Sequence, residues 1–296
     1  MVQDGAEHCH LSLFGIATLI IADDPRLLAT ARAALVDWLS EAPIREPEIT
    51  LRLARDDRPV DWVSPAIRVE GSRLTIDGGG ILGFADAASG EARCRVPARL
   101  IDVPDALADQ VIDPLLLFLA TRRGRTPIHA SGVMIGDMVM VLAGASGSGK
   151  STLAVAAMAR GLMVLSDDTL YVEHHAGLHV WGVPRAIHVF PHDAPPGDHE
   201  TRLRGGKVKC AVQLPAGPRY ADRAALVVLA RGDALALDAI APEEAMRILA
   251  GLEPGFDLLR EESAAAVTAL AVRGAWRLRL THDPDAAIAL LQEAFG

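Results

Sequence analysis

The segment with the clearest chemistry is 144–151, which reads Gly-Ala-Ser-Gly-Ser-Gly-Lys-Ser and satisfies the P-loop pattern G-x-x-x-x-G-K-[ST]. Its glycines allow the backbone to curl until several N–H groups point at one phosphate. Lys150 adds a full positive charge for the β- and γ-phosphates, and the Ser151 hydroxyl can complete the ligand shell of Mg²⁺. We therefore predict that ATP and Mg²⁺ bind here. The predicted nucleotide-binding residues are Gly144, Ala145, Ser146, Gly147, Ser148, Gly149, Lys150, Ser151 and Thr152.

A pair of carboxylates, Asp167 and Asp168, ends the apolar strand that follows the helix after this loop. In an α/β unit these carboxylates lie at the same carboxyl edge of the sheet as the phosphate loop. One of them can hold Mg²⁺, directly or through water, and the other can accept a proton from an attacking hydroxyl. The alternative is an aspartate pair that only turns the chain, and the neighbouring P-loop favours the catalytic interpretation.

His129 and these two motifs, taken in order, resemble the bacterial HPr kinase/phosphorylase family and its relatives. In that family an Ile/Val-His-Gly/Ala strand, a P-loop and a strand ending in Ala/Ser-Asp-Asp follow one another. Here His129 stands 21 residues before Lys150, and Asp168 stands 18 residues after it. By itself, a single histidine on a strand is more often structural than catalytic. The resemblance extends over roughly residues 120–215.

The resemblance implies a kinase that moves the γ-phosphoryl group of ATP to a serine hydroxyl of a peptide or protein. Carried over position by position, it implies three catalytic residues: Asp168 accepts the proton, His129 supports Asp168, and Lys150 stabilises the transferring charge. It places Ser151 on Mg²⁺, with Asp167 as a further candidate for the metal shell. The fold that it implies is α/β, with a P-loop, HPr-kinase-like C-terminal domain and a smaller α+β N-terminal region.

One part of the family pattern is missing. An acidic residue followed by Arg-Gly-Leu-Gly should come after the aspartate pair, and the chain has Trp-Gly-Val-Pro-Arg-Ala-Ile at 181–187 instead. The sequence therefore does not support HPr as the substrate or a reverse phosphorylase reaction. Its layout is more similar to the shorter HPr-kinase-like proteins, some of which modify ribosomally made peptides such as lasso-peptide precursors.

Two further basic residues are candidates for contacts with the acceptor. Arg185 follows Pro184 and could reach the phosphates or the acceptor, although an exposed arginine explains it equally well. Lys207 belongs to the run Arg-Leu-Arg-Gly-Gly-Lys-Val-Lys at 202–209, which is basic in an acidic protein. This run could neutralise the γ-phosphate or an acidic peptide. Alternatively, its lysines protect an exposed strand edge from pairing.

The elements that must position these residues can be read from hydrophobic periodicity. We predict two domains, an α+β region over 1–104 and the catalytic domain over 105–296. In the first, Asp24 caps a helix that starts at Pro25, and short antiparallel strands follow. In the second, strands at 128–135 and 138–143 lead into the loop, and a helix at 150–160 follows.

Composition limits the classes of partner and the location. The 296 residues are 50% hydrophobic and include 29 Lys+Arg against 38 Asp+Glu, a net charge of −9 that argues against nucleic-acid binding. Three separated cysteines fit a reducing compartment. No signal-peptide pattern is present, and the apolar run at 11–22 is too short to span a bilayer, so we expect a cytoplasmic protein without membrane contact.

The function predicted first is therefore an ATP-dependent serine kinase that acts on a peptide or protein. A nucleotide-binding regulatory module with little or no transfer is the second hypothesis, and a small-molecule kinase is the third, because a P-loop does not identify its acceptor. The sequence is compatible with an oligomer and does not specify one. The histidines lack zinc-type spacing, so Mg²⁺ is the only metal predicted.

Overall fold

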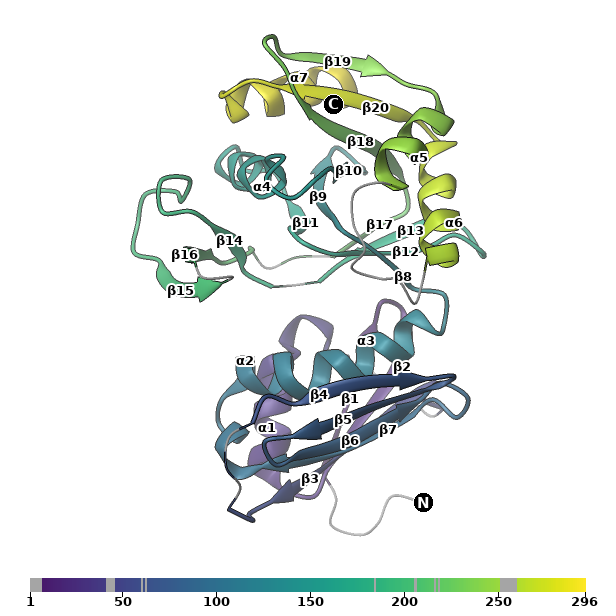
Figure 1. The fold of residues 1–296 in the computed structure, drawn as a ribbon, viewed down its shortest axis with the longest axis vertical. Coiled ribbons are helices and arrows are strands. Elements are labelled where there is room, and N and C mark those ends of the chain that lie inside the picture. Colours follow the sequence, from purple (N-terminus) through teal and green to yellow (C-terminus); the bar gives the residue numbers. More distant parts are fainter. Residues whose placement is uncertain are drawn as a thin grey trace. The chain divides into compact units, whose positions relative to one another are not determined.

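The chain folds into two compact units, and the division between them comes just after helix α3 (Asp113–Thr121). A computed structural model describes residues 7–40, 46–59, 61, 63–183, 185–204, 207–215, 217, 219–250 and 260–296. The protein is mixed α/β and divides into Met1–Arg123 and Gly124–Gly296 (Figure 1). The division differs from the predicted boundary after residue 104. The helices at 104–121 contact the first sheet and helix α1, which is why they belong to the first unit.

A seven-stranded sheet forms the first unit, in the order β1-β2-β3-β7-β6-β5-β4. Its strands are β1 (Glu7–Leu13), β2 (Ile16–Ala22), β3 (Ile49–Asp56), β4 (Ala66–Glu70), β5 (Arg73–Gly78), β6 (Ile81–Asp86) and β7 (Glu91–Pro97). Its α-helices are α1 (Pro25–Ala34), α2 (Pro104–Leu107) and α3 (Asp113–Thr121), with a π-helical turn at Ala108–Ile112. Our expectation of antiparallel strands after α1 was wrong for one pair, because β3–β7 is parallel, and β2–β3 is parallel as well. The helix α1 lies between β2 and β3 in the chain and makes the crossover that a parallel pair requires.

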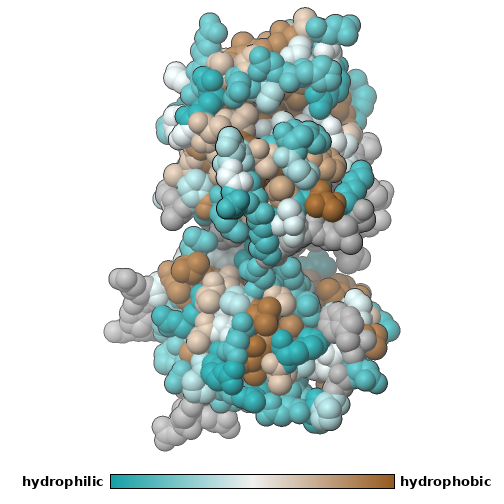
Figure 2. Space-filling model, turned by 90° about the vertical axis from the view of Figure 1, so that its left-hand side faces the viewer, coloured by the Kyte–Doolittle hydropathy of each residue, from teal (hydrophilic) through white to brown (hydrophobic). Residues whose placement is uncertain are grey.

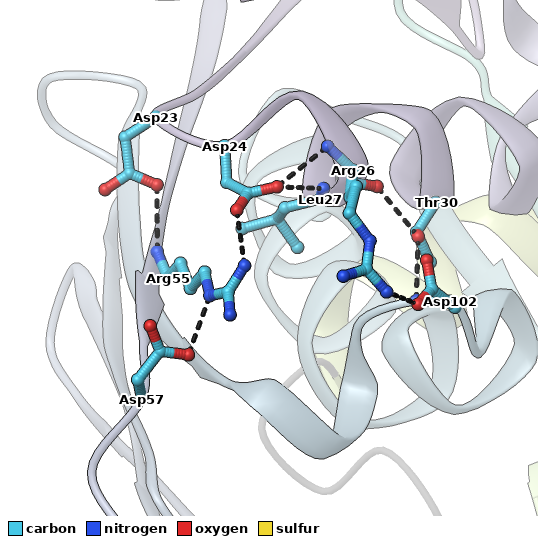
Figure 3. A network of polar contacts seen from close by, with 8 residues as sticks. All are labelled: Asp23, Asp24, Arg26, Leu27, Thr30, Arg55, Asp57 and Asp102. Carbon is cyan, nitrogen blue, oxygen red and sulfur yellow. Dashed lines mark hydrogen bonds and ion pairs between the residues drawn. The ribbon is translucent and has the colours of Figure 1, made fainter.

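The start of α1 confirms the predicted helix cap. The Asp24 carboxylate accepts hydrogen bonds from the backbone N–H groups of Arg26 (2.7 Å) and Leu27 (3.1 Å), as Figure 3 shows. The Arg55 guanidinium donates to the same carboxylate at 2.8 Å. The hydrogen bond from Arg55, and then those of the cap, lower the pKa of Asp24. Asp24 is therefore bound by its own helix and by arginine, which is a structural role.

The described strands of the second unit form three sheets. Their orders are β11-β9-β10-β18-β20-β19, β17-β13-β12-β8 and β14-β16-β15. The strands are β8 (Thr126–Ile128), β9 (Ala130–Ile135), β10 (Met138–Ala143), β11 (Val164–Ser166), β12 (Leu170–Glu173), β13 (His179–Gly182), β14 (Ile187–Val189), β15 (Glu200–Arg204), β16 (Lys207–Val212), β17 (Tyr220–Ala221), β18 (Ala224–Arg231), β19 (Ala236–Ala239) and β20 (Ala275–Leu280). The helices are α4 (Lys150–Ala159), α5 (Pro242–Ala250), α6 (Arg260–Ala271) and α7 (Pro284–Phe295).

Two hydrophobic cores cover the two faces of the six-stranded sheet. One packs apolar residues of α4 and α7, such as Leu153 and Ile288, against Leu142 and Val227 of the sheet. The other joins α5, α6 and the four-stranded sheet to the opposite face, through residues such as Val141. Because both faces of the sheet are covered, β10 and β18 are apolar and buried along most of their length.

Strand direction brings several chain ends to one edge of this sheet. β10, β18 and β20 are parallel, and β9 is antiparallel both to β10 and to β11. The carboxyl ends of β10, β11, β18 and β20 therefore meet at the edge where β9 begins. The strand predicted at 128–135 is broken at His129, where the chain passes from β8 in one sheet to β9 in the other. Among the described residues, no helix has the length and apolar character to cross a membrane.

Candidate active site

The glycine-rich loop 144–149 connects the end of β10 to the start of α4. Gly149 precedes the helix with φ +112°, a left-handed conformation that a residue with a Cβ rarely adopts. Lys150 is the first residue of α4 and is buried, and its Nζ donates a hydrogen bond to the carbonyl oxygen of Gly144 at 2.8 Å. The positive end of the helix dipole and a lysine ammonium are thus placed at the same loop, an arrangement that favours an anion.

Close packing within the loop shows why its first glycine is needed. A Cβ at Gly144 would lie 2.8 Å from Ser148 Oγ and 3.2 Å from Leu229 Cβ, so a larger residue would push the loop out of shape. Ser148 Oγ is itself buried and has no hydrogen-bond partner within the described part of the chain. A buried hydroxyl without a partner costs free energy, and a bound phosphate oxygen would provide one. The loop therefore fits a phosphate group, and its residues Ala145, Ser146 and Gly147 are exposed to solvent.

His129 and the aspartate pair lie close together because the chain passes between the same two sheets at both positions. The chain passes from β8 to β9 at His129 and from β11 to β12 at 167–169. β9 pairs with β11 and β8 pairs with β12, so the two crossings lie next to each other. His129 Nδ1 lies 3.5 Å from Asp168 Oδ1, which is long for a hydrogen bond. The Asp168 side chain is 82% exposed and accessible to an incoming substrate.

Asp167 points to the opposite side, toward the loop. It accepts hydrogen bonds from the hydroxyls of Ser131 (2.9 Å to Oδ1) and Ser151. Burial raises the pKa of Asp167, although the hydrogen bonds from Ser151 and Ser131 and the charge of Lys150 oppose this shift. A carboxylate beside a serine hydroxyl is an oxygen-donor pair that suits Mg²⁺. The structure thus brings together Ser151 and Asp167, the two residues predicted to bind the metal.

Replacement of Asp167 by asparagine is expected to stabilise the nucleotide-free protein at neutral pH. Because folding raises the pKa of Asp167, the protonated form favours the folded state, and this contribution is lost as the pH rises through the folded-state pKa. An asparagine side chain would avoid that loss while still accepting the hydrogen bond from Ser131. We expect Asp167→Asn to raise Tm by about 2–4 °C at about pH 7, with a smaller gain at about pH 4.

Addition of ATP and Mg²⁺ should reverse this order, because the variant lacks one metal ligand. Thermal unfolding with and without the nucleotide measures both effects. A variant that is less stable than the parent in the absence of nucleotide, or that gains as much from ATP and Mg²⁺, would contradict the role given to Asp167.

A pocket of about 340 Å³ adjoins the loop on the side of β18 and β20. It is lined by Gly149, Thr152, Leu153, His192, Asp193, Arg231, Leu280, Thr281, His282 and Pro284. The Arg231 guanidinium donates to the carbonyl oxygen of Thr281 at 3.2 Å, and its other terminal nitrogen lies 3.7 Å from where a Cβ of Gly149 would stand. The pocket therefore joins the loop to the ends of two parallel strands and offers polar groups to a ligand.

Sequence reasoning missed Ser131, Arg231 and His282 as site residues. Ser131 lies in the strand predicted at 128–135, two residues after His129, and this spacing could have indicated it. Arg231 is the last residue of β18, and His282 comes two residues after the end of β20. A strand at 275–280 was not predicted, so the residues after it were not expected at the edge where the carboxyl ends of the parallel strands meet.

The other candidates lie outside this pocket. Arg185 is half-buried between β13 and β14, and its backbone N–H donates to the carbonyl oxygen of Val183. Lys207 is exposed at the start of β16. No group of three or more His, Cys, Asp or Glu side chains that could hold a metal occurs among the described residues. The three cysteines are buried free thiols.

The sequence and the structure were compared with known proteins. No protein-family model matches the sequence, and no curated protein matches it. Among solved structures, the chain is similar to the Hpr(Ser) kinase/phosphatase from Coxiella burnetii, with 14% sequence identity, 57% of this chain and 95% of that chain covered, and a TM-score of 0.33. A TM-score of this size does not establish a shared fold.

Proposed function

We propose that this protein is an ATP-dependent kinase that transfers the γ-phosphoryl group to a serine hydroxyl of a peptide or protein. One observation carries the proposal: the loop 144–149 with Lys150, the Ser151–Asp167 contact and the His129–Asp168 pair occupy one edge of one sheet. A phosphate cradle, a metal-binding pair and an exposed carboxylate are the parts that phosphoryl transfer to a hydroxyl requires. A ribosomally made precursor peptide is the acceptor class that the sequence resemblance favours.

In this mechanism, the residues of the loop hold and orient ATP. Lys150 exchanges its hydrogen bond to Gly144 for the β- and γ-phosphates, and the backbone N–H groups at the start of α4 bind the same oxygens. Ser151 and Asp167 would hold Mg²⁺, which offsets negative charge on the phosphates when bound. Asp168 accepts the proton of the attacking serine hydroxyl, and His129 orients Asp168.

The pocket beside the loop is the proposed place for the adenine and ribose. It begins at Gly149 and Thr152, which stand at the loop, so a nucleotide could extend from the loop into it. Arg231 and His282 offer polar contacts there, and Leu153 and Leu280 offer apolar ones. A pocket of about 340 Å³ lies within the range of small-molecule sites.

The proposed function is tested with ATP labelled in its γ-phosphate. The purified protein is incubated with labelled ATP, Mg²⁺ and a library of serine-containing peptides, and the label is followed by mass spectrometry. Phosphoserine on a peptide is the expected result. Label that appears only as free phosphate, or ATP that binds without turnover, would favour the regulatory module. Transfer to a small metabolite and not to peptides would favour the small-molecule kinase, and absence of ATP binding would overturn all three.

A further inference from the structure

The second unit carries a basic surface that the proposed mechanism does not use. Lys207 and Lys209 lie on β16, and the Lys207 and Lys209 Nζ atoms stand 5.7 Å and 5.6 Å from the ring centroid of Phe190. At such distances each ammonium interacts with the ring face. Phe190 is 36% exposed, Lys207 is exposed and Lys209 is half-buried, so an aromatic ring and a positive charge are open to solvent together, with a second charge beside them. We call Lys207, Lys209 and Phe190 the basic surface.

The two lysines of the basic surface lie opposite basic residues of the neighbouring strand. β16 lies between β14 and β15, and its residues 210–212 pair with β14, whereas Lys207 and Lys209 pair with β15 alone. Its register sets Arg202 opposite Lys209 and Arg204 opposite Lys207 on β15. Four basic residues therefore occupy directly paired positions on β15 and β16. A concentration of like charge in a protein of net charge −9 favours a ligand of the opposite sign.

The basic surface is connected to the pocket beside the loop. The rings of Phe190 and His192 are stacked, with centroids 5.6 Å apart and planes 4° from parallel. His192 lines the pocket together with Gly149 and Thr152. Figure 2 faces the side on which β14, β15 and β16 lie in Figure 1, and hydrophilic residues are interspersed there with hydrophobic ones. Two acidic residues are nearby: Asp193, 3.6 Å from His192, and Glu200, opposite Ala211 on β16.

We propose that the basic surface of Lys207, Lys209 and Phe190 binds an acidic segment of the peptide acceptor. The proposal rests on the proposed kinase function and names the chemistry of its substrate. Lysine ammonium groups pair with the carboxylates of Asp and Glu side chains. The Phe190 ring packs against the methylene groups of the peptide's acidic side chains. A segment held here lies beside the stacked rings of Phe190 and His192, at the border of the pocket proposed for the adenine and ribose.

Binding is measured first, without nucleotide. The probe is a short, fluorescent, N-acetylated, lysine-free peptide of Asp and Glu with one central Ser, and a second peptide replaces Asp and Glu by Asn and Gln. We expect saturable binding of the acidic peptide only. The double variant Lys207→Gln/Lys209→Gln should weaken it by about tenfold, and Lys207→Arg/Lys209→Arg should retain most of it. The control is Arg68→Gln/Arg73→Gln, which removes two exposed charges from the first unit and separates an arginine from the ring of Phe84.

Lysine is rare enough in this chain to identify the contact directly. It occurs only at positions 150, 207 and 209, whereas arginine supplies the other 26 of the 29 basic residues. A carbodiimide that joins peptide carboxylates to protein amines can therefore react at three lysines and the N-terminus. We expect cross-links at Lys207 and Lys209 that excess unlabelled peptide suppresses. Equal binding of the acidic and neutral peptides, or cross-links confined to Lys150 and the N-terminus, would overturn the proposal.

The same variants separate this proposal from the proposed function. Weaker ATP binding with unchanged peptide binding would show that the basic surface serves the nucleotide, and the proposal would fail while the kinase stands. Acidic-peptide binding that depends on both lysines, in a protein that transfers no phosphate, would leave the surface established and overturn the kinase function.

Discussion

Asp168→Asn is expected to lower the rate of phosphoryl transfer by about 10²- to 10⁴-fold while ATP binding stays unchanged. The asparagine keeps the size of the side chain and cannot accept the proton of the attacking hydroxyl. The Asp168 side chain is largely exposed and lies beside His129, outside the loop proposed to hold the phosphates, so its loss should not disturb the nucleotide. Single-turnover transfer and equilibrium ATP binding are the two measurements.

The chain offers a matched control for this variant. Asp222 forms another His–Asp contact in the second unit that also uses the Nδ1 atom of the histidine, with Asp222 Oδ1 2.6 Å from His179 Nδ1. Asp222→Asn removes the same charge from a similar pair and should leave transfer within about twofold of the parent. Transfer at the parental rate by Asp168→Asn would refute its role as the base. If Asp167→Asn alone abolished transfer with MgATP still bound, the roles of the two aspartates would be exchanged.

Lys150→Met is expected to lower transfer by about 10²- to 10³-fold and to weaken ATP binding as well. Methionine fills much of the space of the buried lysine stem but removes the charge that would bind the β- and γ-phosphates. In the nucleotide-free structure the same ammonium donates to Gly144, so the variant also removes one hydrogen bond within the loop. Titration with ATP and the transfer rate at saturating ATP separate the two effects.

The control for Lys150→Met is Arg68→Met, which removes an exposed positive charge from β4 in the first unit. It should change neither ATP binding nor transfer. Because Lys150 is buried, a melting curve of Lys150→Met must first show a folded protein. A folded variant with parental ATP affinity and rate would exclude the phosphate site at this loop.

Local sequence was sufficient for the elements around the loop. The pattern at 144–151 predicts a strand, a tight turn and a helix, because glycine conformations and helix starts depend on neighbouring residues. α4 begins at Lys150 as expected, and Asp24 caps α1 through its own side chain. By contrast, the break at His129 and the π-helical turn before α3 depend on packing, since β8 and β9 pair with different sheets.

Two aspartate pairs show the difference between local pattern and tertiary placement, because Asp23-Asp24 and Asp167-Asp168 each follow an apolar strand. In the first pair, Asp24 is bound to Arg55 and to its own helix (Figure 3). In the second pair, Asp168 faces His129, and Asp167 faces Ser131 and Ser151. The sequence by itself determined the strand, glycine-rich loop and helix at 144–151 and the position of the carboxylates that follow them in the chain. Only the tertiary structure decided which carboxylate meets which partner, and that Arg231 and His282 share a pocket with Gly149. The physical reason is that loop and cap geometry depend on residues a few positions apart, whereas sheet order depends on burying apolar faces contributed by the whole unit.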